Sequence, residues 1–131
     1  MIFLDTSVIY ALADRADPNH LRAKEMFASA LQAGEDLLTH SYVLVESAAL
    51  LQSRLGLSAA LRFLDESQFF RIHWVTPRDH QEAVQLLRER GRRGLSLVDC
   101  VSFVVMRRHG VSTYLAFDED FAREGFTPWN P

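Results

Sequence analysis

The sequence predicts an α/β domain with a short, mostly parallel sheet. Short apolar runs alternate with segments of helical length along the whole chain, as they do when helices connect parallel strands. No linker rich in proline, glycine or serine divides the 131 residues, and 48% of them are hydrophobic against 24% charged. This composition is typical of a globular protein. We therefore predict one domain over residues 1–131.

The N-terminal segment begins with a strand and two helices. The apolar run 1–4 predicts a buried strand that ends at Asp5, and residues 6–13 follow as a short helix. Asp17-Pro18 marks the start of the second helix, because proline favours the first helical turn, and Gly34 ends it. Its apolar stripe is expected to consist of Leu21, Phe27, Ala28 and Leu31.

Two strands flank a pair of helices in the middle of the chain. Residues 36–39 predict a short strand, and residues 41–55 a helix that ends at Gly56. Ser58 is expected to cap the next helix, whose inner face carries Leu61, Leu64 and Phe69. The alternation of polar and apolar residues over 71–75 is typical of a half-buried strand.

The C-terminal segment repeats the alternation. Residues 77–90 predict a polar helix closed by Gly91, and residues 96–108 an apolar helix closed by Gly110. A strand over 113–117 and a helical turn over 118–124 follow, and a proline-containing tail ends the chain.

Charge, cysteine content and hydropathy exclude several classes of protein. The net charge of −3 argues against a protein that coats nucleic acid through bulk charge. Cys100 is the single cysteine, so neither an internal disulfide nor a cysteine-rich zinc site can form. No targeting signal and no membrane-length apolar run is recognisable. We expect a cytoplasmic protein without a membrane segment.

Four acidic residues occur in apolar surroundings: Asp5, Glu46, Asp99 and Asp118. A carboxylate in such a place is costly unless it is paired or binds a cation. Asp5 and Asp118 each end a strand, at the edge where α/β sheets place their ligands. Each acid also has a structural interpretation, because Asp5 and Asp118 could cap helices, Ser96 and Asp99 could form a capping box, and Glu46 could face solvent.

The functional interpretation is a carboxylate cluster that binds a hard divalent cation. Mg²⁺ and Mn²⁺ prefer oxygen ligands, and a cation relieves the repulsion between neighbouring carboxylates. Such a site suits phosphodiester hydrolysis, in which the metal activates water and neutralises charge on the phosphate.

The chain resembles a PIN domain in the order and spacing of four motifs. These are Asp5-Thr6-Ser7, Glu46 in an apolar helix, 95–100 (LSLVDC) and 115–121 (LAFDEDF). More closely, the chain is similar to the toxin ribonucleases of VapBC toxin–antitoxin pairs. The resemblance implies a three-layer α/β/α sandwich, dependence on Mg²⁺ or Mn²⁺, and endonucleolytic cleavage of RNA. It assigns catalysis and metal binding to Asp5, Glu46, Asp99 and Asp118, with Thr6 and Ser96 as supporting hydroxyl residues. Asp120 is a second candidate for the fourth acid.

The same resemblance implies a homodimer silenced by a small antitoxin protein. The predicted helices 41–55 and 58–70 carry more large apolar side chains than one core-facing stripe needs, which favours an interface. A basic run precedes the Asp99 helix and consists of Arg88, Arg90, Arg92 and Arg93. It could contact the RNA backbone, or it could be a solvated helix face. Two interpretations stay open, a catalytic nuclease and a non-catalytic PIN-like RNA- or protein-binding module.

Overall fold

A five-stranded parallel sheet forms the centre of the molecule in the computed structural model, which describes residues 1–130. The strands pair in the order β3-β2-β1-β4-β5. Their bounds are β1 Ile2–Leu4, β2 Leu37–His40, β3 Arg71–His73, β4 Thr113–Leu115 and β5 Thr127–Pro128. The helices are α1 Thr6–Ala13, α2 His20–Gln32, α3 Ser41–Leu55, α4 Leu57–Glu66, α5 Pro77–Arg90, α6 Leu97–His109 and α7 Asp120–Arg123, with a 3₁₀ turn η1 at Ser67–Phe69.

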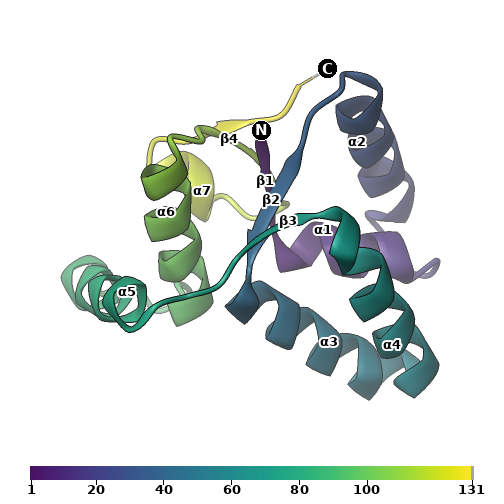
Figure 1. Ribbon diagram of the computed structural model, residues 1–131, viewed down its shortest axis with the longest axis horizontal. Helices are drawn as coiled ribbons and strands as arrows, with labels where there is room; N and C mark the ends of the chain where they lie inside the picture. Colours follow the sequence, from purple (N-terminus) through teal and green to yellow (C-terminus); the bar gives the residue numbers. More distant parts are fainter. Residues whose placement is uncertain (131) are drawn as a thin grey trace.

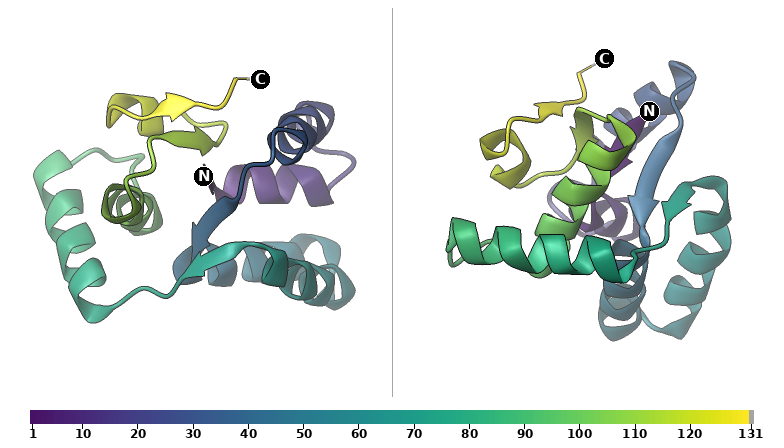
Figure 2. Two further views of the ribbon diagram at one scale, coloured as in Figure 1. Left: turned by 45° about the horizontal axis from the view of Figure 1, so that its top comes forward. Right: turned by 60° about the vertical axis from the view of Figure 1, so that its left-hand side comes forward.

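Two layers of helices enclose the sheet. Figure 1 shows α1 to α4 on one side of the strands and α5, α6 and α7 on the other, and both views in Figure 2 agree. The strand order explains this division. The chain moves outward from β1 to β2 and β3, then returns past both to β4, so right-handed crossovers place the later helices on the opposite face. The predicted three-layer sandwich is confirmed.

The core is centred on β1 and α6. All three residues of β1 are buried, and α6 is buried from Cys100 to Met106. The ring of Phe121 from α7 packs between β1 and α6. Its centroid lies 5.7 Å from that of Phe3 and 5.1 Å from that of Phe103. The apolar length of α6 is therefore used within the molecule, between the sheet and α5.

The start and the inner face of α2 differ from the prediction. Asp17 accepts a hydrogen bond from the Asn19 backbone N–H at 2.8 Å, so it forms a turn, and the helix begins only at His20. Small side chains, Ala23 and Ala30, face the core. Of the stripe predicted for this helix, Phe27 is half-buried, while Leu21, Ala28 and Leu31 are exposed.

The helix α4 likewise presents a different face from the predicted one. It begins at Leu57, directly after Gly56 with its φ of 100°, and no side chain caps it, so Ser58 is not the cap. Ala60 and Phe63 are buried, because α4 packs closely along α3. The predicted inner residues are exposed instead, at 52% for Leu61, 39% for Leu64 and 89% for Phe69.

The C-terminal tail contains a strand that the sequence analysis did not predict. Thr127 donates its backbone N–H to the Ser112 carbonyl at 2.8 Å, and Trp129 donates to Tyr114 at 2.9 Å. Pro128 is tolerated because β5 is an edge strand and needs no donor on its outer side. The predicted strands 71–75 and 113–117 are each shorter, and end at His73 and Leu115.

Within residues 1–130, none of the helices has the length and apolar character needed to cross a membrane.

Candidate active site

Asp5 lies at the carboxyl edge of the sheet, where β1 and β4 end side by side. Its backbone N–H donates to the Leu115 carbonyl at 3.0 Å. Asp5 is 4% exposed, and its carboxylate accepts two hydrogen bonds from Ser7, at 3.2 Å from the backbone N–H and at 2.7 Å from Oγ. Ser7 Oγ in turn accepts from the Phe117 backbone N–H at 3.1 Å. Asp5 therefore caps α1 and is joined through Ser7 to the segment that leads to Asp118.

Burial and like charges raise the pKa of the Asp5 carboxyl. Removal from water has the largest effect, Asp118 and Asp99 add repulsion, and the hydrogen bonds from Ser7 oppose both, so that the pKa of Asp5 reaches about 7. The Asp5 carboxyl is thus poised near neutral pH when no cation is bound.

Asp99 stands in the first turn of α6, where it forms a capping box with Ser96. The Ser96 backbone N–H donates to Asp99 Oδ2 at 3.1 Å, and the Asp99 N–H donates to Ser96 Oγ at 3.0 Å. Burial raises the pKa of Asp99, the charge of Asp120 raises it further, and Arg92 opposes the shift. Ser96 therefore fixes the orientation of the Asp99 carboxylate.

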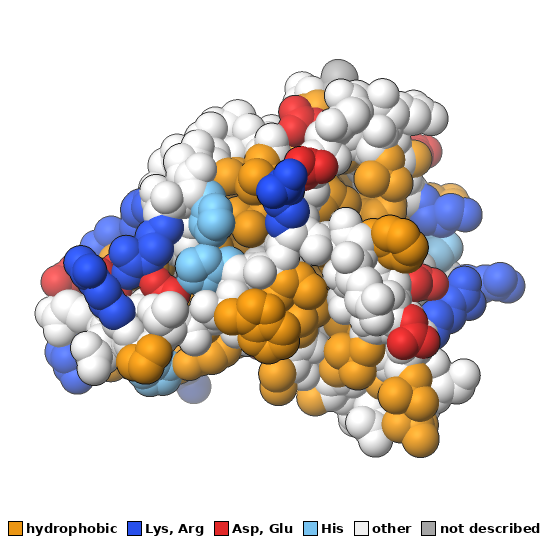
Figure 3. Space-filling view, viewed as in Figure 1, with side chains coloured by type: hydrophobic (Ala, Val, Ile, Leu, Met, Phe, Trp, Pro, Cys, Tyr) orange, Lys and Arg blue, Asp and Glu red, His pale blue; other side chains and the backbone are white. Residues whose placement is uncertain are grey.

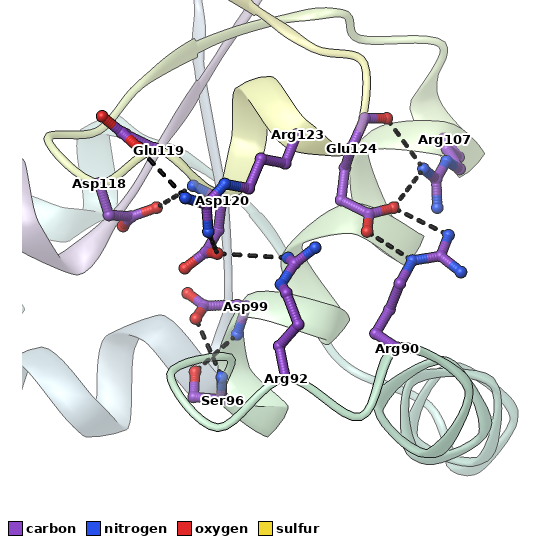
Figure 4. Close-up of polar contacts among 10 residues, drawn as sticks. All are labelled: Arg90, Arg92, Ser96, Asp99, Arg107, Asp118, Glu119, Asp120, Arg123 and Glu124. Carbon is purple, nitrogen blue, oxygen red and sulfur yellow. Dashed lines mark hydrogen bonds and ion pairs between the residues drawn. The ribbon is translucent and has the colours of Figure 1, made fainter.

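Asp118 and Asp120 follow β4 and complete the acidic group. Asp118 Oδ1 accepts the backbone N–H of Asp120 at 3.1 Å. Partial burial raises the pKa of Asp118, and the charges of Asp99 and Asp120 add to the shift. Figure 4 shows the Asp120 carboxylate between Asp99 and the Arg92 guanidinium, whose Nη2 lies 3.2 Å from Asp120 Oδ1. We call these four residues, Asp5, Asp99, Asp118 and Asp120, the aspartate cluster.

The remaining predicted site residues lie on or next to α3 and α1. Glu46 is exposed on α3, and no contact described for residues 1–130 joins it to the aspartate cluster. Thr6 is buried, and its Oγ1 accepts from Ser47 Oγ at 3.4 Å. The structure therefore brings three of the four predicted acids into one electrostatic group and adds Asp120 to them.

The four predicted RNA-binding arginines separate into two kinds. Arg90 forms two hydrogen bonds with Glu124, at 2.6 and 3.1 Å, and Arg92 pairs with Asp120. Arg88 contacts only Gln85 among the described residues, and Arg93 is exposed. Sequence reasoning could not find the two ion pairs, because their acids lie about thirty residues further along the chain and meet the arginines only in the folded protein.

The donors at this edge suit a hard cation by type. All of them are carboxylate oxygens, and their raised pKa values reflect burial first and then mutual repulsion, which a divalent ion would relieve. Within residues 1–130, however, no three His, Cys, Asp or Glu side chains lie close enough together to form a ready metal site. Hydrogen bonds from Ser7 and Ser96 and the ion pair with Arg92 hold the carboxylates in their present orientations.

Comparisons with known proteins give a consistent result. A sequence model of the PIN domain family matches residues 2–126. The chain is 36% identical to the 23S rRNA-specific endonuclease VapC20 of Mycobacterium tuberculosis over 133 aligned positions, which cover 100% of this chain and 99% of the relative.

Solved structures show the same similarity. The crystal structure of M. tuberculosis VapC20, described as a sarcin-ricin loop cleaving toxin, superposes with a TM-score of 0.86 at 34% identity and covers 97% of both chains. FitAcB from Neisseria gonorrhoeae gives a TM-score of 0.69 at 18% identity, and covers 99% of this chain and 97% of that one. A toxin-antitoxin complex from Klebsiella pneumoniae gives 0.67 at 12% identity, with coverages of 99% and 97%. The last two likenesses show the fold alone.

Proposed function

This chain belongs to the PIN domain family, and from that premise we propose that it is an endoribonuclease that requires Mg²⁺ or Mn²⁺. One observation carries the proposal. The carboxyl edge of the sheet gathers carboxylates that raise one another's pKa values, with Asp5 buried among them. Mutually repelling acids are unfavourable for the fold alone and useful at a cation site.

Asp5, Asp99 and Asp118 would hold the cation, with Asp120 or Glu46 as the fourth acid. A bound divalent ion supplies an activated water and neutralises charge that develops on the phosphate. The chain's own residues orient these carboxylates. Ser7 fixes Asp5 through its hydroxyl, and Ser96 fixes Asp99 through the capping box. If Asp120 left its ion pair with Arg92, the guanidinium of Arg92 would become available to bind a phosphate of the substrate.

We propose a ribosomal RNA loop as the substrate. The relative with 36% identity over its full length is named for action on 23S rRNA, and its crystal structure is described as a sarcin-ricin loop cleaving toxin. Single-stranded loops display bases and phosphates that a protein can reach. Arg88 and Arg93 are exposed and form no ion pair among residues 1–130, so they are the candidates for contact with the RNA backbone.

We further propose that the protein is a cytoplasmic toxin, a homodimer that binds a small antitoxin protein. The structural neighbours include toxin–antitoxin complexes. The helix α4 presents an exposed apolar row, Leu57, Leu61 and Leu64, at i, i+4 and i+7. Apolar side chains appear over α4 at the lower right of Figure 3. A surface of this kind is typical of a protein interface.

The decisive experiment is cleavage of a defined RNA. Purified protein is incubated with 23S rRNA in Mn²⁺, in Mg²⁺ or in EDTA, and primer extension maps any cut. We expect one metal-dependent cut within a loop and none in EDTA. If the protein binds the RNA but leaves it intact in both Mn²⁺ and Mg²⁺, it is instead a non-catalytic binding module.

A further inference from the structure

Arg22 on α2 lies beside the proposed active site in a geometry that the reaction described above does not use. Its guanidinium carbon is 5.6 Å from the centroid of the Phe117 ring, and Arg22 itself is exposed. Phe117 immediately precedes Asp118, and its backbone N–H is held by Ser7 Oγ, which also donates to Asp5. Arg22 is therefore connected through Phe117 to Asp118, the next residue in the chain, and through Phe117 and Ser7 to Asp5.

The charge of Arg22 is not neutralised by any acid among residues 1–130. No ion pair or hydrogen bond is formed by its side chain in that range, whereas Arg90 and Arg92 are paired with Glu124 and Asp120. An aromatic ring holds the flat face of a guanidinium and leaves its N–H edge available. That edge can donate two hydrogen bonds to a phosphate group.

Arg22 also approaches the site from the side opposite to the basic run. Figure 1 shows α2 in the layer that contains α1 and α3, and shows α6, which follows Arg92 in the sequence, in the other layer. The carboxyl ends of β1 and β4 lie between the two layers. Cations on both sides of an acidic edge form a path that a polyanion can follow across it.

We propose that Arg22 binds a phosphate of the RNA substrate next to the scissile one, so that the strand lies across the sheet edge from α2 to the loop before α6. This inference rests on the proposed function. Phe117 acts as the positioning residue, since its ring holds the guanidinium in place.

The test compares three variants in Mn²⁺ on a synthetic hairpin that contains the cleaved loop. Arg22→Gln removes the charge, and Arg22→Lys keeps it without the planar group. Lys24→Gln removes a charge from another face of the same helix, because residues two apart do not face each other. KM, kcat and the slope of log(kcat/KM) against log salt concentration are measured, together with the melting temperature.

We expect Arg22→Gln to raise KM by about tenfold with kcat nearly unchanged, and to reduce the salt slope by about 0.7, the value for one contact to a single strand. Arg22→Lys should retain the wild-type salt slope with a smaller rise in KM. Lys24→Gln should match the wild type.

Two results would overturn the inference. The first is an Arg22→Gln protein with wild-type KM and salt slope. The second is a lower kcat and melting temperature in both Arg22 variants, which would show that Arg22 only supports Phe117. Failure of the proposed function is distinct from both, because the wild-type protein itself would then leave the hairpin uncut.

Discussion

At the level of single residues, Asp5 and Asp99 combine two roles that the sequence presents as alternatives. The carboxylate of each accepts a backbone N–H at the start of a helix, and each also belongs to the aspartate cluster. The two roles agree because a helix N-terminus at a strand's carboxyl end favours an anion exactly where α/β sheets bind ligands. Local spacing therefore sufficed to find them. The choice between Asp118 and Asp120 depends on Arg92, which lies far away in the sequence.

Asp5→Asn should abolish RNA cleavage while the fold is retained. The amide keeps an oxygen for Ser7 but removes the charge that would hold a cation, so we expect the rate to fall more than ~100-fold. The rate is measured on the mapped RNA in Mn²⁺. Asp36→Asn is the matched control, because Asp36 is an exposed aspartate paired with Arg71 just before β2, at the opposite edge of the sheet. A cleavage rate equal to that of the wild type would remove Asp5 from the mechanism.

In the metal-free protein, the contribution of Asp5 to the free energy of unfolding should fall as the pH rises from about 4 to about 7, whereas burial lowers the pKa of His40 to about 3 and makes its contribution rise over much of this interval. Asp5 titrates near its usual value of 3.8 when unfolded and at about 7 when folded. Over this interval the folded state holds a proton on Asp5 that the unfolded state has released, so the contribution of Asp5 to the free energy of unfolding falls as pH increases. Thermal melts in EDTA at several pH values measure it. The melting temperature of Asp5→Asn relative to that of the wild type should rise over this interval, and a constant difference between the two proteins would show that Asp5 does not titrate there.

At the level of elements, the C-terminal ends of helices that stop at a glycine were predicted more accurately than helix starts or helix faces. Gly91 and Gly110 end α5 and α6 in left-handed conformations, with φ of 59° and 65°, as their sequence positions indicated. Faces were misassigned where small residues make the contact. Ala60 faces α3 while Leu61 faces outward, so hydrophobicity alone selected the wrong side of α4.

Asp79 connects three elements and should be the most sensitive ion-pair residue outside the site. It is 1% exposed at the start of α5, accepts from Thr76 in a capping box, and pairs with His73 of β3 and Arg108 of α6. These partners hold the pKa of Asp79 well below its usual value, although burial opposes the shift.

Asp79→Asn should therefore lower the free energy of unfolding by about 1–3 kcal/mol, because the amide cannot accept all the hydrogen bonds that the carboxylate accepts from Thr76, His73 and Arg108. Urea denaturation at pH 7 measures the loss. Glu66→Gln serves as the comparison, since it breaks an exposed pair with Arg62 and should change stability by less than about 1 kcal/mol. Equal losses of unfolding free energy in the two variants would show that Asp79 does not stabilise the packing of α5 against α6 more than an exposed ion pair does.

At the level of the whole molecule, the alternation of strands and helices predicted the fold class, and the PIN resemblance predicted the three layers. The edge strand β5 was missed because Pro128 and a two-residue length are poor strand signals. Its pairing is set by contacts from elsewhere, such as the Trp129 side chain, which donates to Ser29 Oγ of α2 at 2.8 Å. Such a contact joins residues one hundred positions apart and has no local signature.

The exposed row on α4 gives the last prediction, which concerns assembly. If the proposed homodimer forms through Leu57, Leu61 and Leu64, Leu61→Glu places a charge within an apolar contact and should convert the protein to a monomer. Its melting temperature at low concentration should stay close to that of the wild type, because Leu61 is already 52% exposed. Leu31→Glu on α2 is the matched control, since Leu31 is also 52% exposed and lies outside the row. Light scattering at micromolar concentration distinguishes the variants: a Leu61→Glu dimer, or dissociation caused equally by Leu31→Glu, would place the interface elsewhere.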